Sequence, residues 1–375
     1  MKAKGKLSIV RRYSYICCKY NKARNKTKKA KALASLKKMK IEENISLRPY
    51  NTFGIDVKCK YFVAGEEEEE FIEFIREYEL KPEEMVLLGR GSNFLFTEDF
   101  EGTVLYPCMQ GIEILSENKE KVSVRVGAGI NWDDFVAWTV NHHLWGVENL
   151  SFIPGHVGAA PVQNVGAYGM EAGEHIVTVE AIDLEKGRKI YIPATDCRFG
   201  YRDSIFKKEW KNKYLITYVI FELSKQAFPR LEYGSIKEEL KQLGGICNLE
   251  NIRQAVVNIR TSKLPDVCTL PNAGSFFKNP IVETPLALQL KAKYPDMPLY
   301  AVNGSFSKLA AGWLIEQSGW KGKNLGKAGV YEKQALVLVN RGNATGLDIV
   351  RLANEIKKSV FLKFNVWIEP EVNIL

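Results

Sequence analysis

The sequence of 375 residues has few of the side chains that build metal sites or disulfide frameworks. Only four histidines and seven cysteines are present, and the cysteines form no C-x-x-C pair and no zinc-like spacing with the histidines. This scatter argues against a metal site or a disulfide framework and is typical of thiols in a reducing cytoplasm. No apolar run reaches the roughly 18 residues of a membrane-spanning helix. We therefore expect a cytoplasmic protein with no metal and no membrane insertion.

Acidic residues are missing from the first 40 positions, which carry 15 Lys or Arg. The formal net charge of +9 comes from this segment, because positions 41–375 hold 38 basic and 44 acidic residues. A basic surface for nucleic acid is therefore not supported in the body of the chain, and only the tail leaves a nucleic-acid binder open as a rival reading. The apolar run at 7–10 is too short for a secretory signal. The lysine-rich composition predicts a disordered extension over 1–40, with Met39 as the expected start of translation.

Short apolar strands alternate with amphipathic helices in the body of the chain. The spacing of Phe71, Phe74, Ile75 and Tyr78 predicts a helix, which begins in a run of five glutamates at 66–70. Other patterns predict strands over 85–88, 122–126 and 335–339, a hairpin of 176–184 with 189–192, a helix that Asn131 caps with Asp134, a helix over 305–318 and a helix through Ile349–Val360.

Two glycine-rich stretches are the candidates for ligand binding. Residues 88–96 place two glycines, a hydroxyl and an amide directly after a strand, an arrangement in which backbone N–H groups converge on a phosphate. The stretch is not a Rossmann fingerprint, because Phe94 stands where the third glycine would be and a strand follows. Residues 153–169 hold four glycines, three alanines and two prolines, so a flat ligand can approach the backbone closely. Each stretch taken alone also fits a structural loop.

These stretches belong to a series of blocks that resembles the UDP-N-acetylenolpyruvoylglucosamine reductases of the Escherichia-like subgroup. The blocks run in unbroken order through the chain: Asn51–Ile55, Gly89–Asn93, Asn149–Gly169, Cys197–Ser204, Lys263–Asp266, Asn272–Pro280, Lys308–Ile315 and Glu369–Val372. The resemblance implies an α+β fold with a vanillyl-alcohol-oxidase/PCMH-type FAD-binding domain at 41–228. Its two subdomains are expected at about 41–112 and 113–228, followed by a connecting insertion at 229–264 and a C-terminal α+β substrate-binding domain at 265–375.

The resemblance also implies the activity and the ligands. The expected enzyme uses NADPH and FAD to convert UDP-N-acetylglucosamine enolpyruvate to UDP-N-acetylmuramate for peptidoglycan, and the alternative is an FAD-dependent sugar or alcohol oxidase of the same fold. We expect noncovalent FAD, because residues 88–96 contain no histidine to tether it. The implied cofactor-binding residues are Asn51, Thr52, Gly89, Gly91, Ser92, Asn93, Pro154, Gly155, Gly158, Gln163, Asn164, Gly166, Ala167, Tyr168 and Gly169.

Three residues match the family's catalytic positions. Ser275 corresponds to the serine that gives a proton to the substrate carbon beside the carboxylate, and its flanking glycine and aromatics predict a partly dry pocket. Arg202 corresponds to the arginine that stabilises the enolate, although a surface salt bridge with Asp203 is its alternative role. Glu371 is expected to work with Arg202, with Glu369 as support. The implied substrate-binding residues are Tyr233, Lys263, Asn279 and Gln334.

A variant that begins at Met39 is expected to match the full chain in flavin content and thermal unfolding, because the removed segment has no apolar pattern with which to pack. Flavin absorbance per polypeptide and the unfolding midpoint of both chains would check this. Loss of flavin or a large fall in the midpoint would contradict it. Salt-sensitive nucleic-acid binding by the full chain alone would instead identify the tail as an interaction arm.

Overall fold

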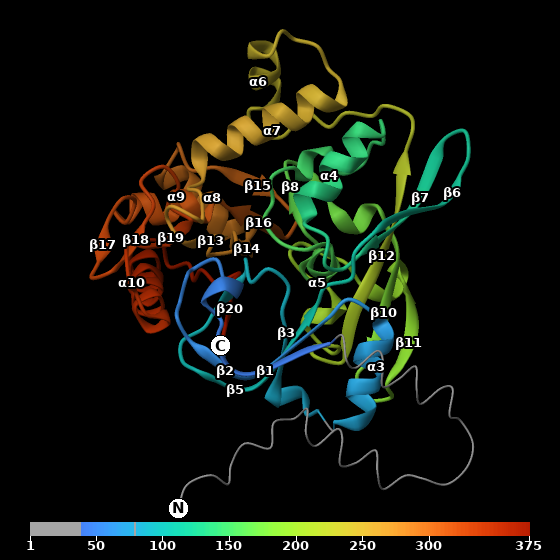
Figure 1. The fold of residues 1–375 in the computed structure, drawn as a ribbon. Coiled ribbons are helices and arrows are strands. Elements are labelled where there is room, and N and C mark those ends of the chain that lie inside the picture. Colours follow the sequence, from blue (N-terminus) through green and yellow to red (C-terminus); the bar gives the residue numbers. More distant parts are fainter. Residues whose placement is uncertain (1–38, 79) are drawn as a thin grey trace, which may run out of the picture.

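The computed structural model describes residues 39–78 and 80–375, so nearly all of the predicted extension lies outside the described residues (Figure 1). The first strand begins at Lys40, and Met39 beside it is buried. Within the described ranges, no helix is both long and apolar enough to cross a membrane. The described chain folds around three successive sheet-bearing parts.

The first sheet has the strand order β1-β2-β5-β3, in which β1 is antiparallel to β2 and the other neighbours are parallel. Its strands are β1 (Lys40–Ser46), β2 (Lys58–Gly65), β3 (Met85–Leu87) and β5 (Phe100–Pro107). Helix α3 (Glu68–Glu77) begins at a capping box in which the Glu70 carboxylate accepts a hydrogen bond from the backbone N–H of Glu67. Phe71 and Phe74 pack against the sheet. The helix and the strand predicted here are confirmed.

Five antiparallel strands form the second sheet, in the order β11-β10-β12-β7-β6. They are β6 (Ile112–Glu117), β7 (Lys121–Gly127), β10 (Ile176–Asp183), β11 (Arg188–Pro193) and β12 (Tyr214–Ser224). Helix α4 (Trp132–Asn141) packs on this sheet, because the rings of Trp132 and Phe135 contact that of Phe221 in β12. The predicted strand at 122–126 and the predicted hairpin are confirmed.

The C-terminal part contains two small sheets and three helices. One sheet has the order β13-β19-β18-β17, with β13 (Asn272–Ser275), β17 (Asn324–Leu325), β18 (Ala328–Val330) and β19 (Val337–Asn340). The other has the order β14-β16-β15, with β14 (Ile281–Glu283), β15 (Leu299–Ala301) and β16 (Phe306–Leu309). The helices are α8 (Thr284–Lys293), α9 (Ala311–Gln317) and α10 (Gly346–Phe364). Helix α10 confirms the predicted amphipathic helix.

Short elements connect these parts. Helices α6 (Ile236–Gln242) and α7 (Leu249–Lys263) pack on each other, and α7 extends from α4 toward the C-terminal part (Figure 1). The second glycine-rich stretch forms α5 (Ala160–Gln163), β8 (Gly166–Ala167) and β9 (Met170–Glu171). The end of the chain returns to the first part, where β20 (Asn373–Ile374) pairs in parallel with β4 (Phe94–Leu95).

Two local predictions are wrong. Residues 306–309 form strand β16, and the helix predicted over 305–318 begins only at Ala311. The strand pairs with a neighbour on each side, and burial alternates along it: Ser307 and Leu309 are buried, whereas Phe306 is exposed. Asn131 caps α4, but its side chain accepts from the N–H of Asp133, and the box with Asp134 is not formed.

One hydrophobic core joins the first sheet to the C-terminal part. Phe53 and Phe62 from the first part are buried in the same cluster as Phe276 and Ile356 from the last. The rings of Phe53 and Phe276 meet edge to face, with centroids 6.2 Å apart. The other face of the first sheet is covered by α3 and by residues of the second sheet. The first sheet is thus packed on both faces, and its position fixes the parts on either side of it.

Replacing Ile356 with Ala is expected to destabilise the protein by about 2–5 kcal/mol, the cost of losing buried methyl groups and leaving a cavity. Ile356 is 0% exposed in the shared core, whereas Leu362 on the same helix is 85% exposed. Leu362→Ala is therefore the matched control and is expected to change stability little. Urea unfolding followed by circular dichroism would compare the variants, and equal midpoints would contradict the importance of the shared core.

Candidate functional site

The loop after β3 depends on a glycine for its shape. Gly91 has a φ of +65°, and a Cβ at this position would lie 1.9 Å from the carbonyl oxygen of Tyr50. Only glycine can therefore take this position. No described residue accepts a hydrogen bond from the backbone N–H groups of 89–92. These N–H groups are available to a phosphate, as the sequence predicts.

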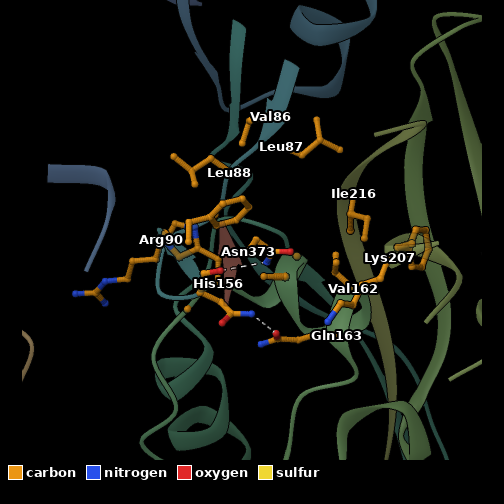
Figure 2. A pocket seen from close by; sticks show the side chains of 18 of the residues that line it. Val86, Leu87, Leu88, Arg90, His156, Val162, Gln163, Lys207, Ile216 and Asn373 are labelled. Carbon is orange, nitrogen blue, oxygen red and sulfur yellow. Dashed lines mark hydrogen bonds between the residues drawn. The ribbon is translucent and has the colours of Figure 1, made fainter. Parts of the chain in front are cut away.

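Side-chain hydrogen bonds hold the two glycine-rich stretches together. Ser92 Oγ donates to the carbonyl oxygen of Pro154 at 3.2 Å, and Asn93 Nδ2 donates to Gln163 Oε1 at 2.6 Å. The second bond is the dashed line that reaches Gln163 in Figure 2. Gly158 allows the second stretch to approach the chain at the end of β7, because a Cβ there would lie 2.6 Å from that of Ala128. The two stretches thus form one wall of a common site.

A cavity of about 570 Å³ lies between these stretches, β12 and the end of the chain. Figure 2 shows Val86, Leu87, Leu88, Val162 and Ile216 around this space, and they give it an apolar character. The volume is within the roughly 300–1,000 Å³ of cofactor pockets. An apolar space bordered by free backbone N–H groups fits FAD, which joins a flat ring system to a pyrophosphate. We call this space the main cavity.

The predicted cofactor-binding residues divide into those that line the main cavity and those that shape its surroundings. The lining residues are Gly89, Gly91, Ser92, Asn93, Pro154, Gly155, Gly158 and Gln163. Residues 166–169 form the turn of β8 and β9 beyond the lining, and the Asn164 amide holds that turn through bonds to Glu171 and Gly200. The Asn51 amide holds the backbone of Leu47 and Ile55. Thr52 lines a different cavity.

Lys207 and His156 are titratable groups of the main cavity, and both are labelled in Figure 2. Burial lowers the pKa of His156 to about 4, so this ring is neutral at pH 7. Burial, followed by the nearby Lys278, lowers the pKa of Lys207, whose Nζ donates to the carbonyl oxygen of Arg202 at 3.2 Å. Among the described residues, no group of three or more His, Cys, Asp or Glu side chains is arranged to hold a metal ion.

Arg202 and Glu371 form an ion pair across 169 positions of sequence, with 3.0 Å between Arg202 Nε and Glu371 Oε1. Their side chains are only 24% and 13% exposed. Arg202 has a left-handed φ of +53°, and its guanidinium lies beside Gly166. The alternative prediction, a surface salt bridge between Arg202 and Asp203, is wrong, because Asp203 pairs with Lys208. The structure therefore brings together two of the three residues predicted to be catalytic.

Ser275 is the last residue of β13 and lies on the segment next to Glu371. The backbone N–H of Glu371 donates to the carbonyl oxygen of Phe276 at 2.7 Å, and the N–H of Lys278 donates to that of Glu369 at 2.9 Å. These bonds align the two segments. Ser275 is exposed, contrary to the partly dry pocket that its neighbours predict. Glu369 is also exposed and joins the site through its backbone.

The four predicted substrate-binding residues lie in different elements. The ring of Tyr233 lies over Gly169, where an added Cβ would be 3.4 Å from it, and the side chain is 46% exposed. Asn279 Oδ1 accepts from the N–H of Ala311 at the start of α9 at 3.0 Å. Gln334 Oε1 accepts from the N–H of Leu336 at 3.3 Å. Lys263 is the exposed last residue of α7.

Three basic residues of the site were not among the predicted site residues: Arg260, Lys207 and Lys308. Arg260 Nε donates to the carbonyl oxygen of Phe152 at 3.0 Å, and burial lowers the pKa of its guanidinium. Lys308 Nζ lies 4.5 Å from the ring centre of Tyr201, the residue before Arg202. Arg260 could have been predicted from the sequence, because it lies one helical turn before Lys263 and therefore on the same face of the helix. Lys308 begins the block Lys308–Ile315, whereas no sequence pattern pointed to Lys207.

Comparison with known proteins agrees with this arrangement. A family model described as the FAD binding domain matches residues 59–191, and one described as the C-terminal domain of UDP-N-acetylenolpyruvoylglucosamine reductase matches residues 266–375. The UDP-N-acetylenolpyruvoylglucosamine reductase of Bacteroides fragilis is 46% identical, covering 89% of this chain and 100% of the relative. The enzyme of that name from Flavobacterium johnsoniae is 45% identical, covering 90% and 100%.

A further relative and a solved structure carry the same enzyme name. The UDP-N-acetylenolpyruvoylglucosamine reductase of Salmonella typhi is 42% identical, covering 88% of this chain and 95% of the relative. The crystal structure of the Thermus caldophilus UDP-N-acetylenolpyruvylglucosamine reductase has a TM-score of 0.64 at 23% identity, covering 90% of this chain and 99% of that one. At this identity the structural likeness supports the fold. The predicted α+β fold with an FAD-binding domain is confirmed.

Replacing Gly91 with Ala is expected to lower flavin occupancy at least about tenfold, because the added Cβ forces the phosphate loop away from Tyr50. Gly326→Ala is the matched control: Gly326 has a φ of +61°, close to that of Gly91, but a Cβ there meets nothing within 4 Å. The ratio of flavin to protein absorbance at limiting FAD would measure the effect. Equal flavin content in the two variants would contradict the role of the close approach.

Proposed function

The chain belongs to the family of UDP-N-acetylenolpyruvoylglucosamine reductases, and we propose from its site how it reduces UDP-N-acetylglucosamine enolpyruvate to UDP-N-acetylmuramate, a step of peptidoglycan synthesis. FAD is the cofactor and NADPH the reductant. Bound FAD supplies the hydride chemistry, from NADPH to the methylene carbon of the enolpyruvyl group. The protein's side chains then hold the substrate carboxylate, balance the charge that develops and supply a proton.

The ion pair of Arg202 and Glu371 is the observation that supports this assignment. Hydride addition to the methylene carbon increases the negative charge on the carboxylate end of the substrate. Glu371 Oε1 lies 3.0 Å from Nε in an ion pair without hydrogen-bond geometry, and the two terminal nitrogens of Arg202 are left for a carboxylate. A cation that is already oriented needs no rearrangement when the charge develops. We therefore assign Arg202 and Glu371 to stabilisation of the enolate.

Ser275 is the proton donor in this proposal. Its exposed hydroxyl lies on the segment that is hydrogen-bonded to the Glu371 backbone, so it neighbours the pair that holds the enolate. A serine is a weak acid, and its proton leaves more readily where positive charge balances the alkoxide. Lys278 is three residues away, and its charge acts on Lys207, so this part of the site carries several cations.

The sugar nucleotide is expected to bind Tyr233, Lys263, Asn279 and Gln334. Lys263 ends the helix that carries Arg260, so both cations can face a pyrophosphate. Tyr233 is exposed beside Gly169 and is the residue that would fold over the UDP-sugar. Its presence in the segment Leu231–Gly234 supports membership of the Escherichia-like subgroup.

The same proposal covers the cofactor residues and the domains. The residues that line the main cavity are expected to contact FAD directly, whereas Asn51, Thr52, Asn164 and residues 166–169 support the loops that do so. Noncovalent FAD fits a phosphate loop without histidine. We divide the chain into an FAD-binding domain at 41–228, an insertion at 229–264 and a substrate domain from 265, although the first subdomain shares its core with the last domain.

The cellular setting is also a proposal. NADPH and UDP-sugars are metabolites of the cytoplasm, so we place the enzyme there, with these two ligands and no nucleic acid as its partners. The oxidase alternative is disfavoured, since the relatives are reductases. An oxidase also has no use for a carboxylate-binding pair beside a proton-donating serine.

Replacing Ser275 with Ala is expected to slow the second half-reaction by about 10²–10⁴-fold, the usual effect of losing a general acid. Flavin binding and anaerobic flavin bleaching by NADPH should stay nearly unchanged, because neither needs that proton. Ser275→Cys is the matched variant and should be milder, since a thiol still donates. Single-turnover recovery of flavin absorbance on adding the enolpyruvyl sugar is the measurement. A wild-type rate for Ser275→Ala would show that the proton comes from another group.

A further inference from the structure

A second cavity, of about 460 Å³, lies between the first part of the chain and the C-terminal part. Residues near 48–54 and Arg90 line it from the first part, and residues 267–271 and 340–343 line it from the last. Three arginines are among its lining residues, Arg48, Arg90 and Arg341, and no Asp or Glu is. We call it the arginine cavity. The catalytic residues proposed above do not line it.

The three arginines differ in how firmly they are held. Two interactions hold the Arg341 side chain. Its Nη2 forms an ion pair with Glu332 Oε2 at 3.1 Å, and its Nε donates a hydrogen bond to Asn324 Oδ1 at 3.3 Å. Arg48 and Arg90 have no ion-pair partner among the described residues. In Figure 2 the Arg90 side chain extends away from the other labelled residues of the main cavity. Arg90 is a lining residue of both cavities, so its charge borders the space assigned to FAD as well as the arginine cavity.

An unpartnered polar atom also lies at this cavity. Thr52 is a lining residue, and its hydroxyl has almost no accessible surface and no hydrogen-bond partner among the described residues. A buried hydroxyl without a partner costs free energy, and a ligand with an acceptor oxygen recovers that cost only if the cavity wall moves to expose the hydroxyl. Arginine forks suit phosphate oxygens, which accept two parallel hydrogen bonds.

We propose that the arginine cavity binds a phosphate-bearing anion, at a site separate from the flavin and the substrate. The volume is within the range of small-molecule sites. Its walls are held in place by two bonds between the parts: the N–H of Asn272 donates to Thr52 O at 2.9 Å, and Asn340 Nδ2 donates to Phe53 O at 3.0 Å. Arg90 lies between Gly89 and Gly91 of the phosphate loop, so occupancy of this site acts on the loop that lines the main cavity.

The test is calorimetric titration of inorganic pyrophosphate into the FAD-loaded full chain at constant ionic strength. Arg48→Gln is expected to raise the dissociation constant at least about tenfold, the usual effect of losing a hydrogen bond to a charged group, and adding Arg341→Gln should weaken binding further. The control is Arg351→Gln, because Arg351 is 75% exposed on α10 and does not line the cavity. Arg48→Gln should keep the wild-type turnover and unfolding midpoint, so that a change in binding is not a change in folding.

A second titration in saturating NADP⁺ identifies the source of the phosphate. Unchanged pyrophosphate binding assigns the site to an independent phosphorylated molecule. Displacement of pyrophosphate by NADP⁺, with a raised KM for NADPH in Arg48→Gln, assigns it to a phosphate of the dinucleotide. No binding at millimolar pyrophosphate, or equal dissociation constants for Arg48→Gln and the wild type, would overturn the proposal. None of these outcomes depends on the role of Ser275. The proposed anion site and the proposed catalytic function can therefore be disproved independently.

Discussion

The parallel pairing of β20 with β4 is the constraint on which the site depends. The N–H of Asn373 donates to the carbonyl oxygen of Asn93, and Asn93 Nδ2 in turn donates to that of Glu371 at 3.3 Å. Glu371 is bonded through its own N–H to Phe276, beside Ser275. One short segment thereby sets the distance between the phosphate loop, the carboxylate that orients Arg202 and the strand that ends in the serine. The pairing thus acts together with the shared core in placing these three groups around one site.

The charges of the site explain why the ligands are anions. Arg202, Arg260, Lys207 and Lys278 lie close enough that their charges affect one another, and burial lowers the pKa of both Arg260 and Lys207. Glu371 pairs directly with Arg202, and Asp203 and Asp133 also lie near members of this group. Such a cluster is costly in the free protein, because like charges repel in a partly dry space. Binding of a pyrophosphate or carboxylate group relieves that repulsion. The repulsion among the basic residues therefore favours the binding of anions.

The local elements and the family motifs were predictable, but several of their contacts were not. Helix α10 follows from apolar periodicity, because it buries one continuous face. The hairpin of β10 and β11 follows from two strand-like runs on either side of the turn at 185–188. Strand β16 was mistaken for a helix, since its short run lies next to the start of α9 and the two periods merge. The predicted roles of Arg202 and Glu371 came from motifs, and their contact joins residues too far apart in sequence for spacing to reveal. The core shared by the first and last parts was missed for the same reason.

The shared core has a consequence for the order in which the protein matures on the ribosome. Phe62 of the first sheet and Phe53 of the connection between β1 and β2 share their core with residues such as Phe276 and Ile356, which are synthesised more than 200 positions later. Most of the chain must therefore emerge before that core is complete, and the long loop that closes adds an entropic barrier. Until then the nascent sheet presents an apolar surface that chaperones recognise. Strand β4 directly follows the phosphate loop and pairs with β20, which lies about 280 positions later, so this edge of the flavin site is complete only after both segments have folded.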